Sequence, residues 1–226
     1  MTLRVVEIQH NILRKNDDLA RKLRERFAAS GTLVVNLLSS PGSGKTTLLE
    51  ETLREFTPRF RVAALVGDQA TRNDADRLAR SGAAVRQITT AAECRLDADM
   101  ISKALRDWDA FPLDILFIEN VGNLICPAEY DLGEDVRVVL CSVTEGEDKP
   151  LKYPLAFNSS HVALLTKMDL AAAVGFNRDA AYDAIGRVHT GITILEVAAR
   201  TGAGMSPWFA LLEERLARKR LVPAAF

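Results

Sequence analysis

This 226-residue chain has no long hydrophobic run and no marked excess of charge of one sign. Its apolar segments all fall short of the roughly 18 residues that cross a bilayer, and Met1 to Glu7 lacks the apolar stretch of a secretion signal. The 29 basic and 30 acidic side chains leave a formal net charge of −1, so no overall field attracts nucleic acid or an anionic membrane. We therefore expect a cytoplasmic protein with neither nucleic acid nor membrane as a partner.

Cysteine and histidine are also scarce, at three residues each. An odd, small number of cysteines argues against a disulfide scaffold and leaves metal binding or simple burial as their roles. The histidines are scattered singly, so the sequence has no His-rich tract for storing metal.

Apolar segments alternate with helical patterns along most of the chain, which predicts an α/β fold with a mainly parallel sheet covered by helices on both faces. We expect a single P-loop NTPase domain over 1–226, with residues 1–30 as an amphipathic N-terminal helical extension. The predicted strands are Leu33–Leu38, Val62–Val66, Ala84–Ile88, Ile115–Ile118, Val136–Val143, Val162–Leu165 and Ile192–Val197, and the helical patterns include Asp74–Ser81 and Leu96–Trp108. The basic tail, Arg215 to Arg220, is expected to be a solvated helix face.

A glycine-rich loop joins the first predicted strand to a helix and reads Ser39-Ser40-Pro41-Gly42-Ser43-Gly44-Lys45-Thr46-Thr47. It matches the phosphate-binding pattern G-x-x-x-x-G-K-[ST] except that Ser39 occupies the first glycine position. Gly42 and Gly44 let backbone N–H groups surround phosphates, Lys45 reaches the β and γ oxygens, and Thr46 offers a hydroxyl to Mg²⁺. We expect Gly42 to Thr47 to bind a nucleoside triphosphate; the alternative is an ordinary glycine-rich turn.

Two acidic residues, Asp68 and Glu119, follow predicted strands that should end beside this loop. With the Thr46 hydroxyl they provide the oxygen ligands that Mg²⁺ prefers, directly or through water. We take Lys45, Asp68 and Glu119 as the candidate catalytic residues. Either carboxylate could instead cap the helix that follows it.

A second motif, Thr166-Lys167-Met168-Asp169, resembles the N-K-x-D sequence with which GTPases recognise guanine. The Asp169 carboxylate can accept from N1–H and from the 2-amino group of guanine, neither of which adenine presents there. We therefore expect Lys167 and Asp169 to bind GTP; an ATPase requires Asp169 to face away from the base. Thr166 replaces the usual Asn, and its shorter side chain puts the contacts to base and P-loop in question.

Taken in order, the motifs resemble those of the HypB family, the nickel-incorporating GTPases of hydrogenase maturation within the dimerising SIMIBI class. The matching segments are Ser39–Thr47, Gly67-Asp68-Gln69, Gln87–Thr90, Cys94 with Leu96-Asp97-Ala98, Phe117–Pro127 and Ser142–Pro154. The resemblance implies hydrolysis of GTP with Mg²⁺ to deliver nickel to a [NiFe]-hydrogenase large-subunit precursor. It also implies a GTP-promoted homodimer, a HypA-type accessory partner, and Lys149 reaching the nucleotide across the dimer interface, although Lys149 could equally be a surface lysine.

The metal-binding sequence departs from that family, which has a Cys-His pair where this chain has Cys94-Arg95 and a second cysteine where it has Cys126-Pro127. Arginine has no acceptor and does not deprotonate, so Arg95 cannot be a ligand; we expect its charge to lower the pKa of nearby thiols. Two copies of Cys94 and Cys126 would supply four thiolates, suited to square-planar Ni²⁺ or tetrahedral Zn²⁺. Alternatively, Cys94 and Cys126 are two small, partly buried residues without a ligand role. We expect Cys141, which lies inside an apolar strand, to belong to the core.

Cys126 lies on the segment that begins at Glu119, so movement of Glu119 and Gly122 toward a γ-phosphate would also move the thiol. Two other functions stay open. A urease-type nickel GTPase is disfavoured because its Cys-Pro-His sequence is absent. A GTP-dependent scaffold protein without metal chemistry stays tenable because of Arg95 and Thr166.

Overall fold

The structure, a computed structural model, describes residues 2–68, 73–90 and 93–221, with side chains from residue 11 onward; Gln69 of the second matching motif lies outside these ranges. The strands are β1 Leu33–Ser39, β2 Val62–Asp68, β3 Ala84–Thr89, β4 Ile115–Glu119, β5 Val136–Ser142, β6 Val162–Thr166 and β7 Thr193–Glu196. The helices are α1 Thr2–Ser30, α2 Lys45–Phe56, α3 Asn73–Ala79, α4 Ala98–Ala104, α5 Lys149–Lys152, α6 Pro154–Asn158, α7 Arg178–Val188 and α8 Met205–Leu221.

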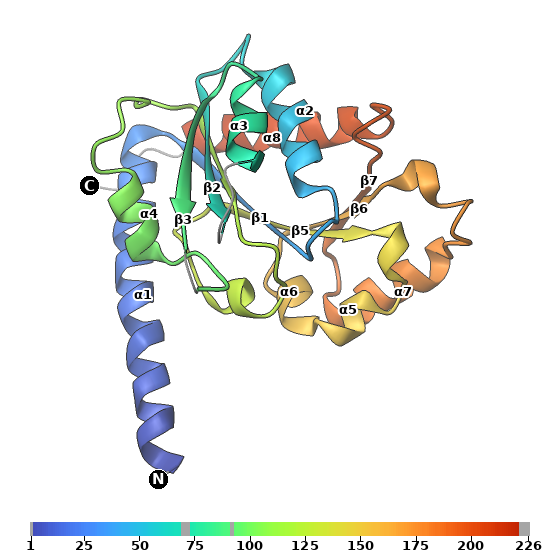
Figure 1. Ribbon diagram of the computed structural model, residues 1–226, viewed down its shortest axis with the longest axis horizontal. Coiled ribbons are helices and arrows are strands. Elements are labelled where there is room, and N and C mark those ends of the chain that lie inside the picture. The colour runs from blue at the N-terminus through green and yellow to red at the C-terminus, as the bar shows by residue number, and fades with distance from the viewer. Residues whose placement is uncertain (1, 69–72, 91–92, 222–226) are drawn as a thin grey trace.

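These strands form one parallel sheet in the order β3-β2-β4-β1-β5-β6-β7 (Figure 1). The central strand β1 is buried along its whole length, as expected of a strand covered on both faces. The parallel sheet and all seven strands predicted from the sequence are confirmed. β5 ends one residue early because Ser142 caps a short 3₁₀ turn that begins at Val143.

Alternate residues of β1 enter opposite hydrophobic layers, which confirms that helices cover both faces. Leu33, Val35 and Leu37 pack with the layer under α2, α3 and α8, where Phe56 and Trp208 are fully buried. Val34 and Leu38 face the other side, in clusters shared with α1 and α4 or with α6 and α7. Figure 1 shows the two helical layers on either side of the sheet.

The N-terminal helix was predicted, and α1 confirms it. Its second half packs on the domain through Ala20, Leu23 and Phe27, while Ile12 is half exposed. Figure 1 shows the N-terminal half of α1 extending away from the sheet. None of the helices in the described ranges combines the length and apolar character needed to span a bilayer.

The predicted helix Leu96–Trp108 is shorter in the structure, where α4 runs from Ala98 to Ala104. Asp97 ends it on the N-terminal side, because its carboxylate accepts the backbone N–H of Met100 at 2.8 Å. Leu96 precedes the cap and packs where Gly67 has no side chain: a Cβ at Gly67 would lie 2.7 Å from Leu96.

The basic tail is not a wholly solvated face, contrary to the sequence prediction. Lys219 pairs with Asp135, and Arg220 pairs with Asp114, at the edge of the sheet where the strands begin. Both carboxylates also accept backbone N–H groups, Asp135 from Val34 in β1 and Asp114 from Arg61, which directly precedes β2. The end of α8 is therefore fastened to the sheet.

Asp114 gives this fastening a pH dependence. Hydrogen bonds from the Arg61 side chain lower the pKa of Asp114 to about 2 against the opposing effect of burial. A lowered folded-state pKa means stability that is present above about pH 4 and lost as the pH falls toward 2. We expect Asp114→Asn to lower the free energy of unfolding by about 1–2 kcal/mol at pH 7, with the deficit shrinking between pH 4 and pH 2.

Urea unfolding at a series of pH values measures this effect. Asp18→Asn, which removes an exposed carboxylate paired with Arg21, is the matched control and should change stability little at any pH. A deficit for Asp114→Asn that is the same at pH 7 and pH 2.5 would contradict the assignment.

Candidate functional site

The loop between β1 and α2 has the backbone shape that the phosphate-binding motif predicts. Gly42 and Gly44 have positive φ values of 76° and 93°, a region that residues with a Cβ rarely occupy. Gly44 directly precedes Lys45, the first residue of the 12-residue helix α2. The N–H groups of the loop and the positive end of the helix dipole therefore face the same side, as an anion requires.

A cavity of about 840 Å³ opens at this loop, within the range of pockets that hold a nucleotide-sized ligand. It brings together most of the residues singled out from the sequence, although their roles stay predictions. Those that line it are Gly42, Ser43, Gly44, Lys45, Thr46, Thr47, Asp68, Cys94, Glu119, Lys167 and Asp169.

Glu119 is almost fully buried at 1% exposure and lies against the start of α2. Its Oε1 accepts the Thr46 hydroxyl at 2.6 Å and lies 3.4 Å from the Lys45 ammonium. Burial raises the pKa of Glu119, and Lys45 and the Thr46 hydrogen bond act in the opposite direction. The second oxygen, Oε2, is buried without a hydrogen-bond partner. A carboxylate oxygen of this kind beside a threonine hydroxyl fits the oxygen ligation of Mg²⁺ or of its bound water.

The guanine motif also contacts the phosphate-binding loop. The Thr166 hydroxyl donates to the carbonyl of Ser43 at 2.6 Å, so the shorter side chain does reach the P-loop, and our doubt about that contact is corrected. Lys167 has a positive φ of 58°, and its side chain passes over Gly44, whose Cβ would lie 3.9 Å from Lys167 Cε. Asp169 lines the cavity from the 3₁₀ turn Met168–Leu170.

Leu170, Val197, Ala199 and Arg200 also line the cavity, and sequence reasoning missed them. The last three follow β7, in a segment with no recognisable motif. The alternation of strands and helices gave the only available signal, since residues after a parallel strand lie at the binding edge of the sheet.

The segment after β4 is joined both to the P-loop and to the first cysteine segment. A Cβ on Gly122 would lie 3.2 Å from the backbone of Pro41, so this glycine permits close packing on the loop. Asn120 is buried, and its Oδ1 accepts the backbone N–H of Leu96 at 3.2 Å. The segment is therefore in contact with both the P-loop and the segment that carries Cys94, which coupling between nucleotide state and thiol position requires.

Lys149 does not line the cavity. It pairs with Glu145 at 2.9 Å, and the other oxygen of Glu145 accepts the Ser43 hydroxyl at 2.8 Å. The lysine is thus connected to the P-loop through Glu145 within one chain, and its predicted reach across a dimer interface stays a prediction.

The side chains of Cys94 and Cys126 lie close enough to interact. The neighbouring Cys94 thiol and burial raise the pKa of Cys126, and Arg95 acts weakly in the opposite direction. The expected lowering of thiol pKa by Arg95 is present at Cys126, but the Cys94 thiol and burial outweigh it. Arg95 also lies 4.0 Å above the ring of Tyr130 and pairs with Glu93 at 2.7 Å.

One chain offers two neighbouring thiols and no larger cluster, because the described residues contain no group of three or more His, Cys, Asp or Glu side chains placed to hold a metal ion. Cys141 is buried in β5, and burial raises its pKa to about 12. This agrees with its predicted place in the core. Any thiolate site with four ligands therefore needs a second copy of the chain.

Three comparisons with known proteins all identify HypB proteins as relatives. Residues 33–196 match the family model described as the CobW/HypB/UreG nucleotide-binding domain. The hydrogenase maturation factor HypB of Rhizobium leguminosarum is 44% identical over 218 residues, which are 96% of this chain and 73% of that protein.

Two solved structures of HypB have the same fold as this chain. That of Archaeoglobus fulgidus gives a TM-score of 0.84 at 39% identity, over 90% of this chain and 100% of that one. That of Helicobacter pylori, in complex with nickel, gives 0.85 at 36% identity, over 94% and 100%.

Proposed function

Because this chain belongs to the HypB family of hydrogenase maturation factors, within the CobW/HypB/UreG group of nucleotide-binding proteins, we propose that it is a GTP-hydrolysing nickel chaperone. It delivers or times the delivery of Ni²⁺ to a [NiFe]-hydrogenase large-subunit precursor in the cytoplasm, with a HypA-type accessory partner. The observation that carries the proposal is the shared cavity, in which Cys94 lines the same space as the P-loop, Glu119 and Asp169.

On the nucleotide side, the backbone from Gly42 to Gly44 and the Lys45 ammonium bind the phosphates. Thr46 and Glu119 would hold Mg²⁺, and Asp68 also lines the cavity. Bound Mg²⁺ would neutralise charge on the phosphates during hydrolysis. The Asp169 carboxylate selects guanine by accepting its two N–H donors.

On the metal side, Cys94 and Cys126 bind the cargo ion as thiolates. Four thiolates from two copies suit Ni²⁺ in a square-planar site or Zn²⁺ in a tetrahedral one. A GTP-promoted homodimer is therefore part of the proposal, and the nickel complex of the Helicobacter pylori relative supports nickel as the cargo. Gly122 on Pro41 and Asn120 on Leu96 provide the route by which nucleotide state changes the position of the thiols.

Nickel and zinc titration of the reduced protein tests this proposal, with dimerisation followed in the presence of GTP and of GDP. We expect about one metal per dimer for the wild type and for Cys141→Ala, and loss of binding in Cys94→Ala and in Cys126→Ala. Binding that survives in both single variants would contradict the thiolate site and favour a GTP-dependent scaffold protein. Equal metal affinity with a non-hydrolysable GTP analogue and with GDP would remove the coupling.

A further inference from the structure

We propose that Asn16, on the N-terminal helix, is a positioning residue that sets the distance between the two thiol-bearing segments. The proposal rests on the function proposed above only in taking Cys94 and Cys126 as the metal ligands. Asn16 lies outside the nucleotide cavity, and its side chain is buried, with the residue 5% exposed.

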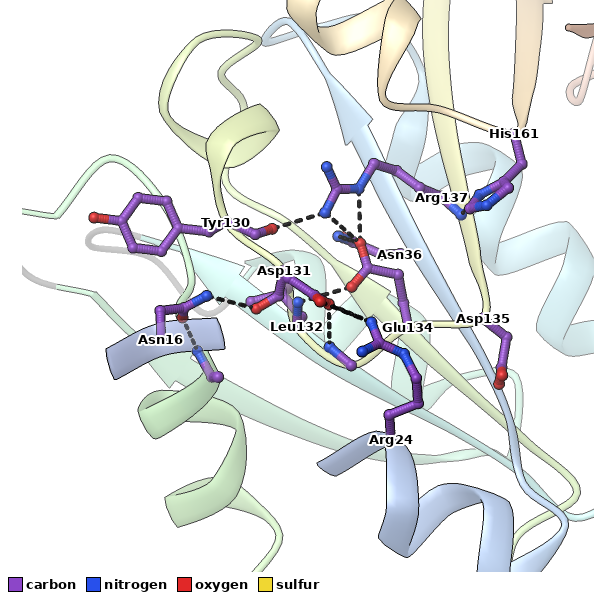
Figure 2. A network of polar contacts seen from close by, with 12 residues as sticks. Asn16, Arg24, Asn36, Tyr130, Asp131, Leu132, Glu134, Asp135, Arg137 and His161 are labelled. Carbon is purple, nitrogen blue, oxygen red and sulfur yellow. Dashed lines mark hydrogen bonds and ion pairs between the residues drawn. The ribbon is translucent and has the colours of Figure 1, made fainter. Parts of the chain in front are cut away.

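The carboxamide of Asn16 contacts both segments at once. Its Oδ1 accepts the backbone N–H of Ala98 at 2.9 Å, and its Nδ2 donates to the backbone carbonyl of Asp131 at 2.8 Å. Ala98 is the fourth residue after Cys94, and Asp131 is the fifth after Cys126. Figure 2 shows Asn16 beside Asp131, with its contact to the Asp131 carbonyl dashed. One side chain thus spans the two chain segments that carry the thiols.

Each contacted segment is itself held firmly, so the bridge fixes a distance rather than restraining a loose end. Ala98 begins α4, directly after the capping residue Asp97. On the other side, buried Arg137 donates to the carbonyls of Ala128 and Tyr130 at 3.0 and 2.8 Å, as Figure 2 shows for Tyr130. Movement of either segment relative to the other must therefore break a hydrogen bond to Asn16 or change the position of α1.

The helix also lies against the backbone that follows Asp131. A Cβ on Gly133 would lie 2.8 Å from the carbonyl oxygen of Ala20 and 3.1 Å from the backbone nitrogen of Arg24. The Arg24 guanidinium pairs with the Asp131 carboxylate at 2.7 Å. This second contact between the same helix and the same loop does not reach α4, which makes Arg24 a matched control.

Loss of the Asn16 carboxamide removes the partner of the buried Ala98 N–H and of the part-buried Asp131 carbonyl, which is unfavourable for both groups. The segments then shift to recover partners, and the thiols move apart. An Asp at position 16 still accepts from Ala98 but cannot donate to Asp131, so it should give an effect of the same sign.

The first measurement needs no metal: the rate at which diamide converts the two thiols into an intrachain Cys94–Cys126 disulfide, itself being reduced to the hydrazine. We expect Asn16→Ala to slow this step about tenfold and Asn16→Asp to slow it at least about threefold, with Arg24→Gln within about twofold of wild type. The second measurement is the nickel–thiolate charge-transfer absorption, which should shift or weaken in both Asn16 variants and stay unchanged in Arg24→Gln.

Unfolding by urea and GTP affinity, measured on the same proteins, separate positioning from general stability. Asn16 variants that are less stable but keep the wild-type disulfide rate and nickel spectrum would overturn the proposal. Should Asn16→Ala not fold, Asn16→Asp and Asn16→Ser supply the same measurements. Nickel binding that needs neither thiol would contradict the proposed function, while the disulfide rate would still decide the role of Asn16.

Discussion

The Asp169→Asn protein is expected to lose about a hundredfold in affinity for GTP and to gain affinity for xanthosine triphosphate. The Asp169 carboxylate accepts both N1–H and the 2-amino group of guanine, whereas an Asn carboxamide has one acceptor and one donor. Its donor would face the guanine amino group, which wastes one charge-assisted bond and leaves two donors opposed. Xanthine has an oxygen at that position, so the same donor becomes a hydrogen bond.

Competition of GTP, xanthosine triphosphate and ATP against a fluorescent GTP analogue measures this change. Asp179→Asn, an exposed acidic position on α7, is the matched control and should leave all three affinities unchanged. Unaltered GTP affinity in Asp169→Asn would mean that this carboxylate does not face the base. Strong ATP binding by the wild type would then identify the chain as an ATPase.

The Glu119→Gln protein is expected to hydrolyse GTP at least about a hundredfold more slowly at a fixed Mg²⁺ concentration. The substitution keeps an oxygen that can accept the Thr46 hydroxyl but removes the negative charge that faces Lys45 and the cation. It also replaces one of the two carboxylate oxygens with an NH₂ group, which cannot ligate a cation. If that oxygen is the unpartnered Oε2, the free ligand atom is lost. Because the main loss is in holding Mg²⁺, extra Mg²⁺ should restore part of the rate.

Single-turnover hydrolysis over a range of Mg²⁺ concentrations measures this effect, with GDP affinity determined in parallel. We expect the Mg²⁺ concentration at half-maximal rate to rise about 10–100-fold while GDP affinity changes far less. Glu129→Gln, an exposed acidic residue in the 3₁₀ turn Cys126–Glu129, should behave as wild type. A normal Mg²⁺ dependence in Glu119→Gln would move cation binding to another residue.

The sequence was sufficient to predict the sheet because buried parallel strands have continuous apolar sequences, such as Leu33–Leu38 and Ile115–Ile118. The phosphate-binding loop could be predicted equally well, since its shape depends on residues that are adjacent in the sequence. Helix ends were harder to predict. The apolar pattern Leu96–Trp108 began before the cap at Asp97, and this cap depends on one side-chain hydrogen bond. Apolar periodicity does not reveal where such a bond forms.

Contacts between residues far apart in the chain could not be predicted from the sequence. Thr166 lies 123 positions from Ser43, and Asn16 lies 115 positions from Asp131, so no local pattern could pair them. The sequence identified Cys94 and Cys126 as candidates by resemblance but could not predict that they lie close together within one chain. It assigned Arg95 an electrostatic role but could not predict that its guanidinium lies over the ring of Tyr130.

The burial of Cys141 has a practical consequence for anyone handling the protein. Its thiol is enclosed in β5, and with a pKa raised to about 12 it carries almost no reactive thiolate at neutral pH. In the folded state, a thiol-modifying reagent should therefore count two cysteines in a chain that contains three. The native sequence can be labelled, spin-probed or cross-linked at Cys94 and Cys126 without engineering, and a third reacting thiol would be a direct signal of unfolding.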